Sequence, residues 1–219
     1  MKILIYGAKG WIGGQFIEVM KQNRLCIHLD FILGEARVDN IVDLKKEIED
    51  VEPTHIISFI GRTHGIIGDK KYSTIDYLEQ KGKINDNVRD NLFSPISLAL
   101  ICKEQGIHYT YLGTGCIFKF DEEHPFGKEE NGFTEDSLPN FFGSGYSVVK
   151  GYTDQLMHFF GDSVLNLRIR MPITGQVNPR NFITKITTYE NICSIPNSMT
   201  VLPELLPKVL DIDFSSSLQ

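Results

Sequence analysis

The stretch Ile3–Gly14, ILIYGAKGWIGG, determines the fold that this sequence predicts. Its first four residues, Ile3 to Tyr6, are apolar and predict a short buried strand. Glycines follow at three-residue spacing, and apolar residues then recur at helical spacing, so the strand turns directly into a helix. The glycines are Gly7, Gly10 and Gly13, and the apolar residues of the helix are Ile12, Phe16, Ile17 and Met20.

This order of strand, glycines and helix is typical of a dinucleotide-binding turn. Gly7 allows the tight turn, Gly10 lets a phosphate approach the backbone, and Gly13 lets the helix pack close to the strand. The first helical residues, Trp11 and Ile12, bring free N–H groups and the positive end of the helix dipole to the anion. The alternative is an ordinary turn with incidental glycines, which the position between a strand and an amphipathic helix disfavours.

Length and composition describe a globular α/β chain. The 219 residues are 42% hydrophobic, and the net charge of −6 argues against a nucleic-acid-binding surface. No signal peptide opens the chain, and no apolar run is long enough to span a membrane. The four cysteines lack the spacing of a zinc site or of a disulfide framework, so we expect a reducing cytoplasm and no metal: Cys26, Cys102, Cys116 and Cys193.

The loop after the second predicted strand distinguishes the two nicotinamide cofactors. The β-rich stretch 25–33 predicts that strand; Asp30 lies inside it, and Arg37 lies in the loop beyond. An acidic residue there binds the ribose 2′-hydroxyl of NAD, whereas an arginine accommodates the 2′-phosphate of NADP. We therefore expect NADP(H), held by Arg37; the alternative is a solvated loop arginine.

Strands and helices alternate along the chain, which predicts a doubly wound parallel sheet with ligands at the carboxyl ends of its strands. The expected strands are a weak one at 38–42 and stronger ones at 55–60, 108–112 and 164–170. The expected helices are 44–51, 85–105, with a kink or break at Pro95, and 146–160. Residues 61–82 read as a long loop without structure of its own, which is usually functional.

The residues after Pro172 predict less structure. Residues 178–181 cap a short helix that runs to Tyr189, and a strand is expected at 193–195. Apolar residues at helical spacing follow between Leu202 and Val209, and 211–219 reads as a polar, disordered tail.

Tyr146 and Lys150 are four residues apart and share one face of a predicted helix. A tyrosine hydroxyl with a pKa of about 10 is a poor acid–base group at neutral pH, and a nearby ammonium lowers that pKa. Such a pair can protonate a carbonyl oxygen while a cofactor delivers hydride to the carbon. Thr114, at the end of the preceding strand, is placed to hydrogen-bond the same oxygen.

Several longer motifs carry a resemblance to a known family. The sequence from residue 2 to about residue 207 resembles the nucleotide-rhamnose synthases, which are extended short-chain dehydrogenase/reductases. The motifs are IYGAKGWIGG (5–14), GTGCIF (113–118), LRIRMPI (167–173), NPRNFITKIT (178–187) and IPNSMT (195–200). Members are bifunctional 3,5-epimerase/4-reductases acting on UDP-4-keto-6-deoxyglucose, so the resemblance implies a UDP-sugar substrate and NADPH.

The resemblance also implies roles for individual residues. The reductase triad is Thr114, Tyr146 and Lys150. Cys116 and Lys185 form the epimerase pair. The cofactor is held by Gly7, Gly10, Trp11, Ile12, Gly13, Arg37, Gly61, Lys150, Met171 and Pro172. The substrate is met by Arg62, Asn91, Arg180 and Asn181.

The epimerase assignment has a chemical basis. A 4-keto group acidifies the protons on C3 and C5, and a thiolate can remove them if a neighbouring lysine lowers its pKa. Thr114 and Cys116 point to the same side if the strand period of two persists there. The alternatives are an inert buried thiol for Cys116 and a solvated lysine for Lys185.

Members of the resembled family continue past the stretch matched here. We therefore expect a Rossmann domain at 1–172, a small, incomplete substrate lobe at 173–210 and the tail at 211–219. The main hypothesis is the bifunctional enzyme. A reductase without epimerase activity and a truncated, non-catalytic NADP-binding protein are the alternatives. The helices 85–105 and 146–160 form the usual dimer surface in the resembled superfamily, so we expect a homodimer.

Overall fold

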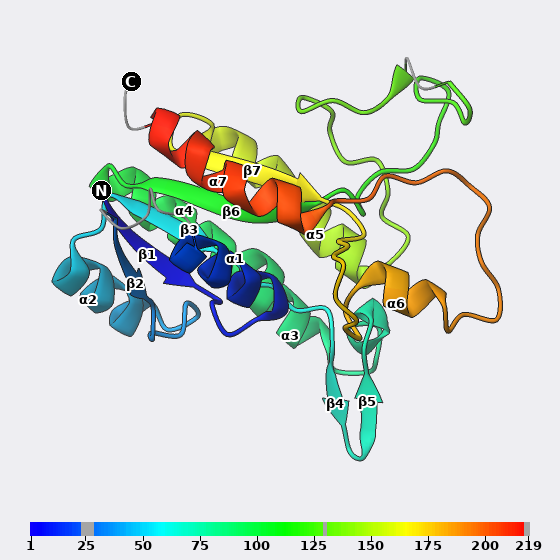
Figure 1. The fold of residues 1–219 in the computed structure, drawn as a ribbon, viewed down its shortest axis with the longest axis horizontal. Coiled ribbons are helices and arrows are strands. Elements are labelled where there is room, and N and C mark those ends of the chain that lie inside the picture. Colours follow the sequence, from blue (N-terminus) through cyan, green and yellow to red (C-terminus); the bar gives the residue numbers. More distant parts are fainter. Residues whose placement is uncertain (23–28, 129–130, 217–219) are drawn as a thin grey trace.

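A five-stranded parallel sheet forms the centre of the molecule (Figure 1). The computed structural model describes residues 1–22, 29–128 and 131–216. The strand order is β2-β1-β3-β6-β7. The strands are β1 (Lys2–Tyr6), β2 (Asp30–Leu33), β3 (His55–Ser58), β6 (His108–Thr114) and β7 (Val164–Ile169). The predicted doubly wound parallel sheet is confirmed. The direction in which successive strands are added to the sheet reverses between β1 and β3, where such sheets bind ligands.

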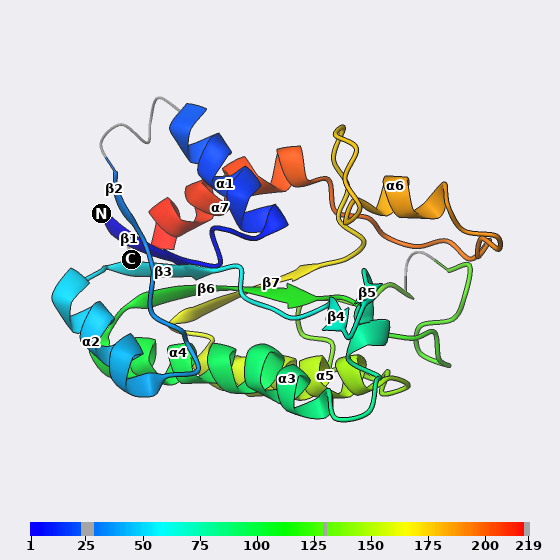
Figure 2. The same ribbon diagram turned by 90° about the horizontal axis from the view of Figure 1, so that it is seen from below.

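Helices cover both faces of the sheet (Figure 2). On one face lie α1 (Trp11–Gln22) and α7 (Leu202–Ser216), whose apolar residues form one core with the side chains of β1 and β3. On the other lie α2 (Ile41–Val51), α3 (Ile84–Val88), α4 (Ser94–Gln105) and α5 (Gly145–Met157). A second core fills the space beneath this layer. In the described part of the chain, no helix is long and apolar enough to cross a membrane.

The second and third predicted strands differ from the structure. Of the stretch 25–33, residues 30–33 form β2, and residues 25–28 lie outside the described part. The weak strand at 38–42 was a wrong prediction. Val38 is buried in a turn, and the Asn40 side chain accepts a hydrogen bond from the backbone of Asp43 and caps α2. A cap residue here starts a helix, and it overrides the β propensity of two isolated valines.

The segment 61–82 is structured, which corrects the prediction of a plain loop. It forms an antiparallel hairpin of β4 (Gly65–Ile67) and β5 (Lys70–Tyr72), followed by a 3-10 turn at Ile75–Tyr77. The hairpin projects from the body of the molecule (Figure 1). Gly65 is required for this packing, because a Cβ there would lie 2.4 Å from the ring of Tyr77.

The break expected at Pro95 is a π turn at Arg89–Phe93, between α3 and α4. Proline has no N–H to offer the carbonyl four residues earlier, that of Asn91, and its ring would clash with that oxygen in a regular helix. The wider turn relieves the clash. The freed Asn91 carbonyl accepts a hydrogen bond of 2.6 Å from the Thr153 hydroxyl of α5.

After β7 the chain makes an excursion and returns. It contains α6 (Phe182–Ile186), and its two ends are joined by a parallel bridge between Ile173 and Val201. The strand predicted at 193–195 does not form, because the residues there are mostly exposed and have no strand beside them. Helix α7 then packs beside α1 and continues to Ser216, so residues 211–216 are helical and not a disordered tail.

A buried ion pair fixes the long loop 119–145 to the core. The Asp154 carboxylate of α5 accepts hydrogen bonds from Arg168 of β7 at 2.7 and 2.9 Å. The same guanidinium donates to the backbone carbonyls of Thr134 and Ser137 at 3.0 and 3.1 Å. One arginine therefore holds together the helix, the sheet edge and the loop.

Breaking this pair should destabilise the protein strongly. Asp154→Ala leaves the Arg168 guanidinium without its buried partner, which costs about 3–5 kcal/mol and lowers the melting temperature by roughly 10 °C. Asp162→Ala, which removes the exposed partner of Lys103, is the control and should change little. Equal melting temperatures for the two variants, measured by calorimetry, would contradict this assignment.

Candidate active site

The glycine turn after β1 forms a cradle with no room for side chains. Gly7 has a φ of +76°, and a Cβ there would lie 2.8 Å from the Phe59 carbonyl carbon. A Cβ on Gly13 would lie 2.3 Å from the Gly7 oxygen, which Gly10 contacts through its backbone N–H at 2.9 Å. Helix α1 begins directly after the turn, with Trp11 and Ile12 at its N-terminus. The cradle fits a pyrophosphate, whose charge the helix N-terminus favours.

Arg37 lies in the loop between β2 and α2, as the sequence predicts. Its side chain is 67% exposed, and its guanidinium lies 2.9 Å from a carboxylate oxygen of Asp39. Arg89 lies 3.7 Å from the other oxygen of the same carboxylate. A phosphate bound here would therefore compete with Asp39 for Arg37.

At the carboxyl end of β3, Asn91 supports the backbone of Arg62. Its side-chain oxygen accepts from the Arg62 N–H at 2.9 Å, and its amide nitrogen donates to the Arg62 carbonyl and to the Asn87 side chain, both at 2.9 Å. Asn91 is 1% exposed. The amide of Asn91 is committed to protein partners here, and the substrate contact expected of Asn91 stays a prediction. Gly61, next to Arg62, is exposed at this edge of the sheet.

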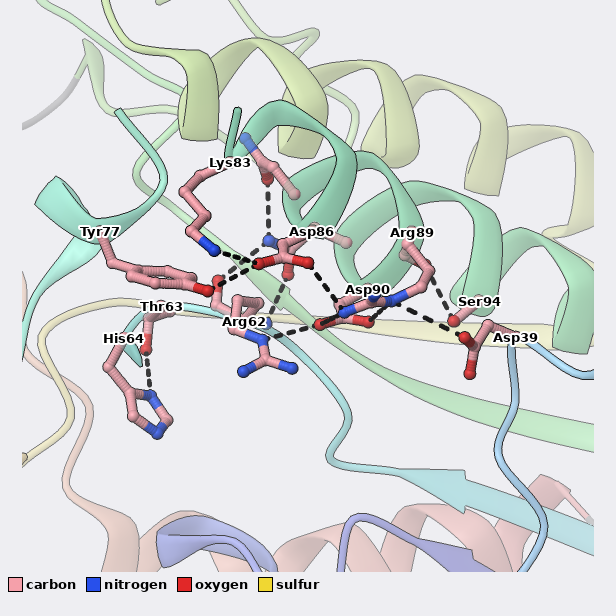
Figure 3. Close-up of polar contacts among 12 residues, drawn as sticks. Asp39, Arg62, Thr63, His64, Tyr77, Lys83, Asp86, Arg89, Asp90 and Ser94 are labelled. Atoms are coloured by element: carbon pink, nitrogen blue, oxygen red, sulfur yellow. Dashed lines mark hydrogen bonds and ion pairs between the residues drawn. The ribbon is translucent and has the colours of Figure 1, made fainter. Parts of the chain in front are cut away.

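The Arg62 side chain belongs to a ladder of alternating charges along α3 and the π turn (Figure 3). Asp90 accepts hydrogen bonds from Arg62 Nε at 2.7 Å and from Arg89 Nε at 2.8 Å. Asp86 pairs with Arg89 at 3.3 Å and accepts a 2.6 Å hydrogen bond from the Tyr77 hydroxyl. In the described part of the chain, the two terminal nitrogens of Arg62 make no hydrogen bond. The ladder thus orients a guanidinium that retains free donors.

Thr114, Cys116 and Tyr146 meet at the end of β6. The strand ends at Thr114, whose hydroxyl accepts from the Cys116 N–H at 3.1 Å, so a turn replaces the strand period assumed above. Tyr146 is nevertheless adjacent to both side chains. Burial and the neighbouring Cys116 raise the pKa of Tyr146, and a hydrogen bond with the Thr114 hydroxyl opposes that rise. At neutral pH Tyr146 is a protonated phenol, and hence a proton donor.

Lys150 does not contact Tyr146 in the way that the sequence suggests. Its ammonium donates to the hydroxyl of Tyr111 and lies 3.5 Å from the Leu112 carbonyl oxygen. No hydrogen bond joins Lys150 to Tyr146 in the described ranges. Lys150 is 5% exposed, and burial lowers its pKa to about 8, against the opposing effects of Asp154 and Cys116.

Glu79 holds the start of the helix that carries Tyr146. Its carboxylate accepts from the backbone N–H groups of Gly145 and Tyr146 at 3.0 and 3.1 Å. A carboxylate at a helix N-terminus satisfies free donors and complements the dipole. Tyr77 and Leu78, from the same segment, pack against Tyr146 with Cys116 at the border of the cluster. The hairpin segment therefore forms one wall of the site.

A cationic cavity of about 150 Å³ lies between the hairpin and the excursion after β7. It is lined by His64, Lys71, Ser73, Asn178, Pro179 and Arg180. The Arg180 guanidinium donates to Nε2 of His64, so this imidazole is neutral. Burial, and then the charges of Arg180, Arg62, Lys185 and Lys71, lower the pKa of His64. Such a concentration of positive charge favours an anion.

The remaining predicted residues are placed less directly. Lys185 lies beside Arg180, and no hydrogen bond, ion pair or electrostatic interaction joins it to Cys116 in the part of the chain that the structure describes. Asn181 is buried, caps α6 and donates to the Thr174 and Gln176 carbonyls at 2.7 Å, and the substrate contact expected of it stays a prediction.

Met171 and Pro172 follow β7 at the same edge of the sheet. Met171 has a φ of +41°, a conformation that non-glycine residues rarely adopt. Such strain often accompanies a binding site.

Comparison with known proteins identifies the family. The chain is 54% identical over 213 residues to the uncharacterized protein L780 of Acanthamoeba polyphaga mimivirus, covering 97% of this chain and 70% of L780. The crystal structure of the L780 UDP-rhamnose synthase superposes with a TM-score of 0.89 at 52% identity, over 99% of this chain and 72% of that one. This chain belongs to the nucleotide-rhamnose synthase family.

More distant relatives are consistent with membership of this family. A bifunctional dTDP-4-dehydrorhamnose 3,5-epimerase/dTDP-4-dehydrorhamnose reductase of Arabidopsis thaliana is 38% identical over 93% of this chain and 63% of its own length. A dTDP-4-dehydrorhamnose reductase structure from Clostridium acetobutylicum has a TM-score of 0.74 at 18% identity, which shows a shared fold. No family model matches the sequence.

Three residues of the site were not predicted for this family member. Tyr111 lies three positions before Thr114 on β6, and Glu79 and Tyr77 lie in the segment taken for a loop. The strand period of two predicts that Tyr111 lies on the same face of β6 as Tyr109, and both side chains are buried. The sequence shows no other sign of Tyr111. Nothing local in the sequence pairs Glu79 with a helix that begins 66 residues later.

Proposed function

We propose that this chain is a bifunctional 3,5-epimerase/4-reductase that converts UDP-4-keto-6-deoxyglucose to UDP-L-rhamnose with NADPH. The observation that carries the proposal is the meeting of Tyr146, Thr114 and Cys116 at the sheet edge that also bears the glycine cradle. A phenol that donates a proton and a thiol that can remove one border the same space. The relatives named above supply the substrate class.

The reduction step needs a proton at the C4 oxygen and a hydride at C4. Bound NADPH supplies the hydride. Tyr146, protonated at neutral pH, donates its hydroxyl proton to the C4 oxygen, so the ketone becomes an alcohol. The Thr114 hydroxyl hydrogen-bonds the same oxygen and orients it. The charge left on Tyr146 is stabilised by the nearby Lys150 ammonium, and a proton from solvent restores the phenol.

Epimerisation precedes reduction and uses the same ketone. The Cys116 thiolate removes a proton from C3 or C5, and the electron pair moves onto the C4 oxygen as an enolate. Return of a proton from the opposite face inverts the carbon. The position of Lys185 beside Arg180 favours a second candidate, a 4-reductase without epimerase activity, because Cys116 then lacks its expected partner.

The cationic cavity is our candidate site for the diphosphate of the sugar nucleotide. Arg180 and Lys71 line it, and Arg62 presents free guanidinium donors nearby. Guanidinium groups bind phosphate oxygens in pairs, which fixes orientation as well as position. In this assignment residues 1–172 with α7 hold the cofactor, and the excursion between β7 and α7 holds the substrate.

We expect Tyr146→Phe and Cys116→Ala to separate the two chemistries. Tyr146→Phe should lower NADPH oxidation by about 100-fold or more but leave solvent deuterium exchange at C3 or C5. Cys116→Ala should abolish that exchange and leave some direct reduction. Mass spectrometry of the substrate in heavy water measures both.

The unaltered protein is the control for the variants Tyr146→Phe and Cys116→Ala. NADPH oxidation without any deuterium at C3 or C5 would establish the reductase alone. Undiminished exchange in Cys116→Ala would show that Cys116 has only a packing role.

We expect NADPH to bind better than NADH through Arg37. A charge-assisted hydrogen bond to a phosphate is worth about 1.5–3 kcal/mol, so Arg37→Ala should weaken NADPH binding roughly tenfold or more. NADH lacks the 2′-phosphate and should lose much less. Fluorescence titration with each cofactor tests this, and equal losses would refute the role.

We also propose that two chains pair through α4 and α5. Apolar side chains on these adjacent helices are exposed, among them Leu100 at 56% and Tyr152 at 54%. Light scattering should give twice the chain mass of 24.9 kDa. Leu100→Glu should dissociate the pair, whereas Val42→Glu, on the exposed side of α2, should not. A monomer at micromolar concentration would refute the proposal.

A further inference from the structure

Tyr111 is buried beneath the active site, and its hydroxyl contacts the Lys150 ammonium. It lies on β6 and is 1% exposed. Lys150 Nζ donates a hydrogen bond to the phenol oxygen and lies 4.6 Å from the centre of the ring. The ammonium therefore lies at the hydroxyl end of the ring, and the phenol oxygen is the acceptor that Tyr111 offers it.

The Lys150 ammonium has few other partners. A buried cation needs acceptors, because removal from water favours its neutral form. The Leu112 carbonyl at 3.5 Å is a weak second acceptor. Asp154 and Cys116 act on the charge of Lys150, but in the described part of the chain neither of them hydrogen-bonds its nitrogen. The Tyr111 hydroxyl is the principal acceptor.

The polar groups that might otherwise hold Lys150 are committed elsewhere. The Asp154 carboxylate accepts from Arg168 and from the Asn166 amide. The Asn91 side chain is used by Arg62 and Asn87, and its carbonyl by Thr153. Among the residues that the structure describes, neither Asp154 nor Asn91 hydrogen-bonds the ammonium.

We propose that Tyr111 is a positioning residue that keeps the Lys150 ammonium charged and directed at the catalytic end of β6. The proposal rests on the function proposed above, in which that charge stabilises the deprotonated Tyr146. Tyr111 acts through Lys150 and does not itself transfer a proton. Burial and the neighbouring Tyr109, Tyr146 and Asp154 raise its pKa, so it remains a neutral phenol that can accept from the ammonium.

The test compares Tyr111→Phe with Tyr109→Phe. Each variant removes one buried hydroxyl from the same face of β6. Of these two tyrosines, Tyr111 is the one whose hydroxyl accepts a hydrogen bond from Lys150. The chemical shift of the Lys150 Cε, in protein labelled with ¹³C-lysine and assigned with Lys150→Met, reports the pKa of Lys150 directly. Melting temperatures confirm that each variant folds.

We expect Lys150 to titrate near pH 8 in the unaltered protein and in Tyr109→Phe. In Tyr111→Phe the midpoint should fall by about one pH unit, because the charged form loses its main acceptor. The decline of NADPH oxidation above pH 8, where Lys150 loses its proton, should move down by the same amount. Tyr111→Gln, which restores an acceptor oxygen, should recover part of the shift.

The two readouts separate the outcomes. An unchanged Lys150 midpoint in Tyr111→Phe would overturn the proposal, whatever the activity. A lowered midpoint with an unmoved pH profile would overturn the catalytic part, because the charge on Lys150 would then not limit the reaction. A lowered midpoint in protein that never reduces a keto-sugar would refute the proposed function and leave the structural role of Tyr111 standing. Should Tyr111→Phe fail to fold, Tyr111→Gln against Tyr109→Phe decides the same question.

Discussion

The hydrogen bond from the Thr153 hydroxyl to the Asn91 carbonyl connects the parts of the site. It exists because Pro95 cannot use that carbonyl and forces a π turn into the helix. The turn leaves the Asn91 side chain able to hold the Arg62 backbone at the end of β3. Thr153 lies on α5 one turn after Lys150. Because Pro95 lacks an N–H, Asn91 can contact both the Arg62 backbone at the end of β3 and helix α5, which carries Tyr146.

Two electrostatic environments lie next to each other at the edge of the sheet. Around Tyr146 the groups are buried, and burial shifts the pKa of Tyr146 upward and that of Lys150 downward, in each case toward the neutral form. Around His64 the charges are numerous and of one sign, and burial is only partial. A ketone with a charged diphosphate tail matches this division. The buried side around Tyr146 suits proton and hydride transfer, and the cationic side around His64 suits binding of a diphosphate.

The sequence predicted what depends on local periodicity. The glycine cradle, the helices around Leu44 and Tyr146 and the parallel sheet followed from spacing that the chain shows within a few residues. It could not predict that the side-chain amides of Asn91 and Asn181 donate to backbone carbonyls of this chain. Nor could it show that Lys150 would contact Tyr111, because these two residues are separated by 39 positions in the sequence. The β4–β5 hairpin was missed because its strands are only three residues long, too short to show a strand period.

The excursion between β7 and α7 begins and ends at nearly the same point. The Arg170 carbonyl accepts from the Thr200 N–H at 2.8 Å, and the Ile173 carbonyl from the Leu202 N–H at 3.0 Å. Because these bonds fix both ends, the energetic penalty of a longer or shorter segment between them grows only slowly with length. In the proposed function this segment holds the substrate, so the cofactor fold and the substrate site are free to diversify at different rates. An insertion or exchange within this one segment can change its surface while the sheet, the glycine cradle and helix α5 stay as they are.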